Sequence, residues 1–244
     1  MLELPDSRLN TASWEKVSKA EQSSYQAMQA GLQAFAPSFP VPLLENRALA
    51  DVFMKLRLDC PQLFYAGTFQ YRYYSDSRNA ELIPAYLFEK GKLKEHQKAL
   101  QSRVEKLVRP VARCSDEEKL LYIHDFICKN VRYDKLKKQY SHEIIGVLGH
   151  GVGVCEGIAK AVKILCDALQ IQCIIALAEN NPEKGVKYRH AWNVVRLDKK
   201  YYHLDCTFDL SLGNPEEIRY DYFLLSDKQI FRDHERLVWR VPAC

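Results

Sequence analysis

The sequence contains no long apolar run, and this absence limits what the chain can do at a membrane. Nowhere does it reach the roughly 18 consecutive apolar residues that a membrane-spanning helix needs. The first residues run into Asp6 and Arg8 without the apolar core of a secretion signal. We therefore expect a soluble, cytoplasmic chain with no membrane partner. A signal peptide removed from a natural precursor is left open.

The sequence also lacks a large excess of charge of either sign. The 35 lysines and arginines barely exceed the 31 aspartates and glutamates, and the densest basic cluster is Lys135, Lys137 and Lys138. A nucleic-acid-binding surface gathers its basic groups on one face, whereas a spread excess is typical of a solvated surface. The sequence therefore predicts no nucleic-acid partner, and it carries no signal for an oligomeric state.

Grouped metal ligands are missing as well. There are eight cysteines, but none forms a C-x-x-C pair, and no acidic loop resembles a calcium site. Cys128, Cys166 and Cys173 have apolar neighbours, as small core residues do. We therefore predict no metal and no cofactor, and we expect a reducing compartment rather than a disulfide framework.

Hydrophobic spacing predicts an α+β chain whose N-terminal part combines helices with one β-hairpin. Apolar residues at helical intervals predict helices over 14–35, 44–56 and 93–108. Aromatic-rich runs at 63–74 and 80–88 predict two paired strands joined by a turn. Prolines at 37, 40 and 42 are expected to end the first helix.

A boundary is predicted just after the third helix. Ser115 and Glu118 form a capping-box pattern, in which the serine accepts a backbone N–H and the glutamate reaches back to the cap. The helix that follows has a predicted buried stripe of Leu120, Ile123, Ile127 and Val131. We therefore expect an accessory region over 1–112 and a core region over 113–244.

A glycine-rich loop leads into a cysteine at the start of a predicted buried helix. Glycines at 146, 149, 151 and 153 precede Cys155, and they indicate a flexible, open loop. Helical spacing of apolar residues follows, at Ile158, Val162, Leu165, Cys166 and Leu169. Free N–H groups and the dipole at a helix N-terminus stabilise a thiolate, so Cys155 is a candidate nucleophile. We interpret Gly157 as room for a substrate beside the backbone. The alternative for Cys155 is a buried, inert thiol.

Two strand-like runs, 190–197 and 201–205, are separated by a predicted turn at Asp198-Lys199. If that turn has two residues, Val194 faces His203 and Trp192 faces Asp205. Side chains alternate along a strand, so His190, Trp192, His203 and Asp205 then share one face of the sheet. His190 and Asp205 become diagonal neighbours, whereas a slip of one residue would send Asp205 to the other face.

These residue types together suit thiol chemistry. An imidazole takes the thiol proton and later protonates the leaving group, while a carboxylate fixes the tautomer of the imidazole. We predict Cys155 as nucleophile, His190 as base and Asp205 as the residue that orients it. His190 and Asp205 each have a structural alternative, His190 as a core histidine and Asp205 as a cap of the next turn. Asp209 is a possible substitute for Asp205 as the orienting residue.

The neighbours on the same face receive weaker interpretations. Trp192 either lines a substrate cleft or packs behind His190, and we carry it with Gly157 as a substrate-binding candidate. His203 is interpreted as structural. The Cys155 backbone N–H is a candidate oxyanion donor, and the side chain that would complete the oxyanion hole is not assigned.

Three segments resemble successive motifs of the transglutaminase-like superfamily: 153–161, 190–195 and 202–209 match its nucleophile, histidine and aspartate blocks. The residues Asn130 to Asp134 are similar to the segment before the nucleophile loop in bacterial members. The resemblance, over roughly residues 115–227, implies a papain-like core in which the cysteine helix packs against an antiparallel sheet bearing the histidine and aspartate. The zinc-binding cysteine pairs of the family's peptide N-glycanases are missing.

The resemblance implies a cysteine enzyme that acts on amide bonds of a protein or peptide through an acyl-enzyme. Hydrolysis, as in a protease or amidase, is the first expectation because water is always available. A protein cross-linking acyltransferase is the alternative. A non-catalytic binding scaffold is the third. The intact Cys–His–Asp set weighs against it, because a scaffold would have no need to keep all three residues. Fold alone does not separate enzyme from scaffold.

Overall fold

The computed structural model describes residues 18–75, 77–214 and 216–244. The described residues divide into two compact units, one ending at Lys98 and the other running from Ala99 to Cys244. The division lies inside helix α3 (Lys90–Val108), which is the third predicted helix. The domain boundary that we expect after residue 112 stays a prediction. Among the described helices, none combines the length and the apolar character needed to cross a bilayer.

The first unit is built on a three-stranded antiparallel sheet, with strand order β1-β3-β2. Its strands are β1 (Phe39–Pro42), β2 (Ala66–Tyr73) and β3 (Asn79–Tyr86). The β2–β3 hairpin confirms the predicted pair. Strand β1 was not predicted, because Pro40 and Pro42 were interpreted only as helix stops; they lie in an edge strand, where a missing N–H is tolerated.

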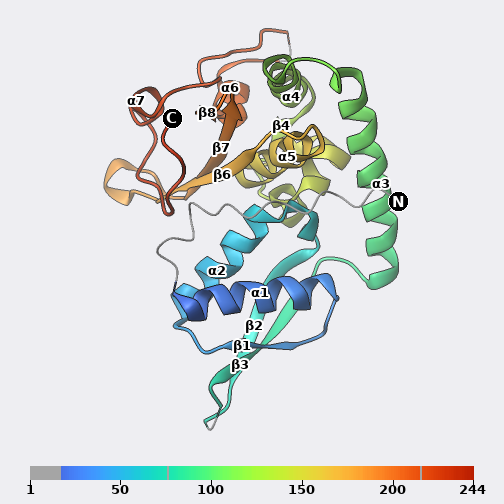
Figure 1. Ribbon diagram of the computed structural model, residues 1–244, viewed down its shortest axis with the longest axis vertical. Coiled ribbons are helices and arrows are strands. Elements are labelled where there is room, and N and C mark those ends of the chain that lie inside the picture. Colours follow the sequence, from blue (N-terminus) through green and yellow to red (C-terminus); the bar gives the residue numbers. More distant parts are fainter. Residues whose placement is uncertain (1–17, 76, 215) are drawn as a thin grey trace. The chain divides into compact units, whose positions relative to one another are not determined.

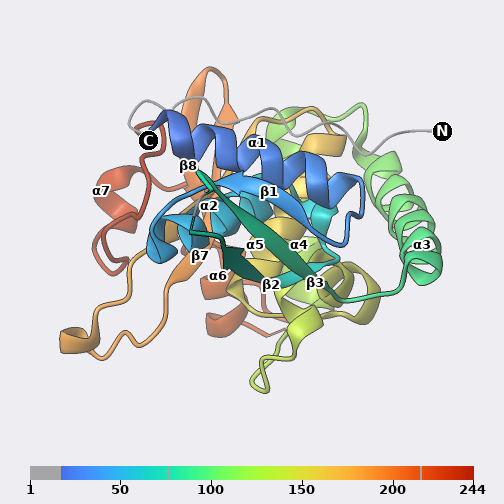
Figure 2. The same ribbon diagram turned by 90° about the horizontal axis from the view of Figure 1, so that it is seen from below.

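Two helices pack in this unit, and helix α1 lies along β1 (Figures 1 and 2). Helix α1 (Lys19–Gln33) begins at a capping box of Ser18 and Glu21 and buries Tyr25, Met28 and Leu32. The predicted start of this helix, at Trp14 and Val17, lies outside the described residues. Helix α2 (Asn46–Asp59) is followed by a short 3-10 turn, Pro61–Leu63.

The aromatic run of β2 packs against α2. Phe69 contacts Phe53 with ring centroids 4.8 Å apart, and the Tyr73 hydroxyl donates to the Asn46 side chain at 2.8 Å. This is the half-buried strand that aromatic and β-branched residues favour.

The second unit holds another three-stranded antiparallel sheet, of order β6-β7-β8. Its strands are β6 (Cys173–Ala178), β7 (His190–Leu197) and β8 (Lys200–Leu204). Helix α5 (Cys155–Ala168) packs on β6 and β7, and helix α4 (Asp116–Asn130) packs on α5 (Figure 1). The predicted α+β core, with a cysteine-bearing helix on an antiparallel sheet, is therefore confirmed.

Short elements complete this unit and carry the chain around the sheet. Strand β4 (Arg132–Tyr133) pairs in parallel with β5 (Val152–Gly153), just before Cys155. The remaining elements are the 3-10 turns Arg109–Val111, Gln139–His142 and Pro182–Lys184, the π-helical turn Ile145–Gly149, and helices α6 (Cys206–Leu212) and α7 (Asp227–Ile230).

Two local predictions in this unit hold in detail. Ser115 and Glu118 form the capping box, with Glu118 N–H donating to the serine oxygen at 3.3 Å and Ser115 N–H to the glutamate at 2.8 Å. In the β7–β8 hairpin Val194 pairs with His203, and both turn residues have positive φ, 48° at Asp198 and 68° at Lys199. Positive φ at both positions is what a two-residue type I′ turn requires.

The glycine loop differs from the flexible, open loop that its sequence indicates. It contains a π-helical turn, and a Cβ added at Gly157 would lie only 2.2 Å from the Ser141 carbonyl oxygen. The space beside Gly157 is thus filled by the backbone of Ser141 and His142. The interpretation of Gly157 as a substrate-binding residue is wrong, because the chain itself makes the close approach that glycine permits.

We predict that Gly157→Ala destabilises the protein by about 1–3 kcal/mol, because the new methyl group forces the Gln139–His142 turn away from α5. The measurement is the free energy of unfolding by denaturant. The matched control is Gly149→Ala, where the nearest atom lies at an ordinary contact distance of 3.6 Å and little change is expected. Equal stability of Gly157→Ala and wild type would contradict this packing.

Candidate active site

Cys155 is the first residue of α5 and is partly exposed, whereas the ten residues from Gly157 to Cys166 are all buried. The chain enters the helix through Val154, whose N–H donates to the Ser141 carbonyl at 3.0 Å. The thiol therefore sits on a rigid support, at the helix end where free N–H groups and the dipole favour a thiolate.

A buried ionic cluster fixes the first turn of this helix. Lys160 Nζ donates to both Glu143 oxygens, at 3.1 and 3.0 Å, and to Glu156 Oε1 at 2.7 Å. It also donates to the His142 carbonyl at 3.1 Å, while the His142 ring contacts Glu156 at 3.0 Å. Because a buried cation needs anionic and hydrogen-bonding partners, this cluster ties the preceding loop to the helix directly behind Cys155.

His190 and Asp205 meet as the predicted register requires. The His190 Nε2 atom lies 2.6 Å from Asp205 Oδ2, at the start of β7 and the end of β8. Burial lowers the pKa of His190, but the charge of Asp205, its hydrogen bond and a hydrogen bond to Cys155 together raise this pKa to about 10. Since Nε2 faces Asp205, Nδ1 is the nitrogen left for the thiol. The three residues are thus brought together.

Asp205 serves two structural purposes at once. Its Oδ1 atom accepts from the N–H groups of Thr207 at 2.9 Å and Phe208 at 3.2 Å, so it caps helix α6. Its Oδ2 atom receives His190. Burial opposes ionisation, yet the charge and hydrogen bond of His190, with a further histidine, hold the pKa of Asp205 well below its usual range. Asp205 therefore caps α6, as the structural alternative suggested, and also contacts His190, as the orienting role requires.

That further histidine is His234, which the sequence analysis missed. Its Nε2 atom lies 2.9 Å from the same Asp205 oxygen that faces His190. His234 follows α7 in an irregular segment, and neither periodicity nor a motif marks it. Only the path of the chain after β8 places it beside Asp205.

Trp192 packs behind His190 and does not line a cleft. It is 1% exposed, and its ring lies nearly parallel to that of His190, 5.8 Å away. Its Nε1–H donates to His203 Nδ1 at 2.9 Å, and His203 Nε2 in turn faces Asp227 at 2.8 Å. The interpretation of Trp192 as a substrate-binding residue is therefore wrong, and the structural interpretation of His203 agrees with its full burial.

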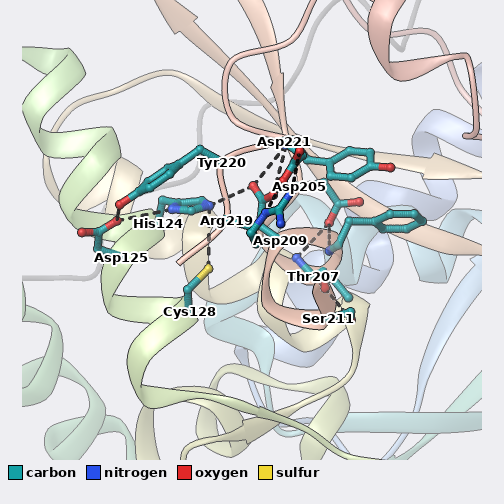
Figure 3. Close-up of polar contacts among 12 residues, drawn as sticks. His124, Asp125, Cys128, Asp205, Thr207, Asp209, Ser211, Arg219, Tyr220 and Asp221 are labelled. Atoms are coloured by element: carbon teal, nitrogen blue, oxygen red, sulfur yellow. Dashed lines mark hydrogen bonds and ion pairs between the residues drawn. The ribbon is translucent and has the colours of Figure 1, made fainter. Parts of the chain in front are cut away.

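Asp209 belongs to a separate cluster (Figure 3). It accepts from His124 Nε2 at 3.0 Å and from the Tyr222 backbone N–H, so it is not a substitute orienter for His190. Cys128 lies 3.7 Å from the same His124 nitrogen, which makes a second Cys–His–Asp set. All three side chains are buried, and burial with nearby carboxylates raises the pKa of Cys128 to about 12. This second set is therefore unsuited to nucleophilic chemistry.

Tyr133 brings a hydroxyl to the nucleophile. It pairs with Gly153 across β4 and β5, and Asp134 N–H donates to the Gly153 carbonyl at 2.9 Å. Burial and the charge of Cys155 raise the pKa of Tyr133, while a hydrogen bond from the Cys155 backbone N–H lowers it. The hydroxyl therefore lies beside the Cys155 N–H.

Among the described residues, two clusters bring three potential metal-ligand atoms within 4.8 Å of one another: His190–Asp205–His234 and His203–Asp227–Cys244. In the first, both Nε2 atoms are hydrogen-bonded to Asp205; in the second, His203 Nε2 is hydrogen-bonded to Asp227. A metal ion would need the nitrogen lone pairs that these protons occupy. We therefore assign neither cluster to a metal.

Comparison with known families gives a match to the model of the transglutaminase-like superfamily over residues 105–206. This segment belongs to the transglutaminase-like superfamily. The matched range includes Cys155, His190 and Asp205, and it ends one residue after the aspartate. The recognition made from the three motifs is thereby confirmed.

Solved structures match parts of this chain at low identity. A TGase crystal structure is 14% identical, with 58% of this chain and 44% of that chain covered and a TM-score of 0.37. A candidate cysteine protease from Cytophaga hutchinsonii is 15% identical, with 57% and 61% covered and a TM-score of 0.37. Menin, in a structure that reveals the binding site for the Mixed Lineage Leukemia protein, is 15% identical, with 78% and 36% covered and a TM-score of 0.36.

The chain spans less than two thirds of the length of each of these structures, and at these TM-scores none of them carries an argument about the reaction. A comparison with curated proteins finds no match. The chemistry of the transglutaminase-like core therefore has to be argued from its own residues.

The raised pKa of His190 makes a prediction about pH. With a pKa of about 10, the ring is a cation throughout the neutral range, so alkylation of the Cys155 thiolate should remain fast well below pH 8. His190→Ala removes that cation and should move the onset toward the free-thiol pKa of about 8.5. At pH 6.5 we expect alkylation to slow about 100-fold, measured at Cys155 by peptide mapping. Cys114, which is also partly exposed, is the internal reference. Overlapping profiles would show that His190 does not act on the thiol.

Proposed function

We propose that this chain is a cysteine-nucleophile enzyme that cleaves amide bonds of a protein or peptide through an acyl-enzyme. The observation that supports it most directly is the 2.6 Å contact between His190 and Asp205, on a histidine whose pKa is raised by Asp205 and also by Cys155. Cys155 is partly exposed at a helix N-terminus, where a thiolate is stabilised and a substrate can reach it.

The proposed reaction uses the three residues in sequence. The Cys155 thiolate attacks the amide carbonyl carbon, and the electron pair of the C=O bond moves to oxygen. As the C–N bond breaks, the His190 imidazolium gives its proton to the leaving nitrogen, which departs as an amine. Water then attacks the thioester while His190 takes its proton, and the products are a carboxylic acid and free enzyme. Asp205 keeps the imidazole in the tautomer that these transfers need.

The developing oxyanion requires donors, and two groups beside the nucleophile are candidates. We propose that the Cys155 backbone N–H and the Tyr133 hydroxyl stabilise the carbonyl oxygen of the tetrahedral intermediate. The support is their mutual proximity at the nucleophile and the parallel β4–β5 pairing that fixes Tyr133 there. This proposal assigns Tyr133 to the side-chain position of the oxyanion hole.

The surroundings of the site favour a polypeptide substrate. Leu136 is 78% exposed three residues after Tyr133, and Tyr188 is 67% exposed two residues before His190. Lys137 Nζ lies 3.4 Å from the centroid of the Tyr188 ring, so the two flanking loops meet. Exposed apolar side chains next to the reacting residues suit contacts with the side chains of a peptide.

Acyl transfer to an amine is the second candidate. It shares every step up to the thioester, and a lysine side chain then replaces water as the attacking group. A non-catalytic scaffold is the third candidate. The accessible thiol beside a histidine of raised pKa weighs against the scaffold, because peptide recognition alone does not need that pairing.

The enzyme proposal predicts that Cys155 alone reacts rapidly with iodoacetamide near pH 6. All eight cysteines are free thiols, and burial raises the pKa of Cys128 and of Cys244 to about 12, so these should lag. Cys155→Ala should abolish cleavage of an unfolded test protein such as casein and leave the unfolding free energy nearly unchanged. A fluorescent primary amine in the same assay separates hydrolysis, which yields new termini, from transfer, which labels casein. Uniformly slow labelling of all eight cysteines would favour the scaffold.

The oxyanion proposal has its own test in Tyr133→Phe. We expect amide turnover to fall about 100-fold because one oxyanion donor is lost. Alkylation of Cys155 should change less than about twofold, because displacement at iodoacetamide forms no tetrahedral oxyanion. Tyr188→Phe is the matched control, since its contact with Lys137 uses the ring and not the hydroxyl. Parallel losses of turnover and alkylation in Tyr133→Phe would instead indicate a general disturbance of the nucleophile.

A further inference from the structure

We infer that His234 is a positioning residue of this site: as an imidazolium held between Asp205 and Asp233, it keeps Asp205 ionised and aimed at His190. This inference rests on the proposed function, and it adds a residue beyond the matched family segment, which ends at residue 206. The described hydrogen bonds of His234 are with Asp205 and Asp233 and not with Cys155, so it acts through Asp205.

The hydrogen bonds of Asp205 leave little freedom to its carboxylate. Oδ1 is held by the two N–H groups at the start of α6, and Oδ2 is shared between His190 Nε2 at 2.6 Å and His234 Nε2 at 2.9 Å. The side chains of Asp205 and His234 are each 1% exposed, so water does not substitute for either contact. Without His234, Oδ2 would keep one donor fewer in a buried place, which costs free energy for a charged oxygen.

The second nitrogen of His234 determines its protonation. His234 Nδ1 lies 2.7 Å from Asp233 Oδ1, so each ring nitrogen faces a carboxylate oxygen. A neutral imidazole donates through only one nitrogen, and its other lone pair would then oppose an anion. Both contacts are favourable only when both nitrogens carry protons. The Asp233 carboxylate also accepts from the Tyr222 hydroxyl, which occupies its Oδ2.

Charged and titratable groups reach His234 from several elements. His190 on β7, His203 on β8 and Asp205 at the cap of α6 face it, along with its own neighbour Asp233. The remaining contacts are rings that exclude water: Phe208 at 4.5 Å, Trp192 at 4.8 Å and Tyr222 at 5.6 Å. The result is a line of alternating charge: thiolate, His190 cation, Asp205 anion, His234 cation, Asp233 anion.

Removing the positive charge of His234 raises the pKa of Asp205. The carboxylate of Asp205 loses both a cation and a hydrogen bond. At low pH it then takes up a proton, His190 loses its orienter, and the thiolate–imidazolium pair weakens. At neutral pH Asp205 stays ionised, and the pair persists. A defect confined to the acid side is therefore the signature of this role, whereas a packing defect would act at every pH.

The experiment is a pH series of Cys155 alkylation on His234→Gln, which keeps a donor to Asp205 but carries no charge at any pH. We expect alkylation roughly tenfold slower than wild type at pH 5 and within about twofold at pH 8. Asp233→Asn alters a side chain that is 46% exposed and leaves every buried group in place. Because an imidazole is protonated at pH 5 even without a second carboxylate, this variant should stay within about twofold of wild type at both pH values. Asp221→Asn is the matched control, since that exposed carboxylate pairs with Arg219 outside this line.

A second readout does not depend on the thiol. In protein with ¹⁵N-labelled histidine, both ring nitrogens of His234 should carry protons at pH 7, and Asp233→Asn should remove the proton on Nδ1. A neutral His234 in wild type, or an acid-side profile unchanged in His234→Gln, would overturn the inference. If wild-type Cys155 shows no selective reactivity while His234 is doubly protonated, the proposed function fails and the assignment of His234 stands.

Discussion

The second unit depends on one buried carboxylate. Asp205 lies between β8 and α6, caps α6 and accepts four hydrogen bonds, two from backbone N–H groups and two from histidines. An ionised group in such a place is tolerated only because every lone pair has a donor and because cationic partners are close. The Asp205 side chain therefore both caps the helix that follows the hairpin and stabilises the protonated form of His190. Asp205 can fill both roles only if its side chain lies on the same face of the sheet as His190.

Much of this arrangement could be predicted from local sequence, because its causes are local. The capping box at Ser115, the helix that starts at Cys155 and the turn at Asp198-Lys199 each depend on neighbours a few residues apart, and the turn then fixes the pairing that unites His190 with Asp205. His234 could not be predicted, because no pattern near it encodes the path that returns the chain to Asp205. Gly157 and Trp192 were misinterpreted for a related reason: sequence shows that a position is small or aromatic, but not whether substrate or the chain itself occupies the space beside it.

Comparison of the two Cys–His–Asp sets shows what residue identity leaves undetermined. Cys128, His124 and Asp209 reproduce the chemical types of the site within a few ångströms (Figure 3). Cys128, however, lies inside a helix whose N–H groups are already used, and burial keeps its thiol protonated. Cys155 has the helix end, a histidine of raised pKa and an opening to solvent. Reactivity thus follows from position on the helix and access, and the same three residue types can equally well form part of a core.

The length of the turn between β7 and β8 determines which residues of the two strands face each other in the site. Asp198 and Lys199 both have positive φ, as a two-residue turn requires, and this turn fixes which residue of β8 pairs with each residue of β7. That pairing makes His190 and Asp205 neighbours. One residue more or fewer in this turn would exchange the two faces of β8 and turn the carboxylate away from the imidazole. The connection between β6 and β7 is not restricted in this way, because its length does not affect the pairing of β7 with β8. In this chain, the segment before His190 can therefore change in length without altering how β7 pairs with β8, whereas a one-residue change in the turn would move Asp205 away from His190.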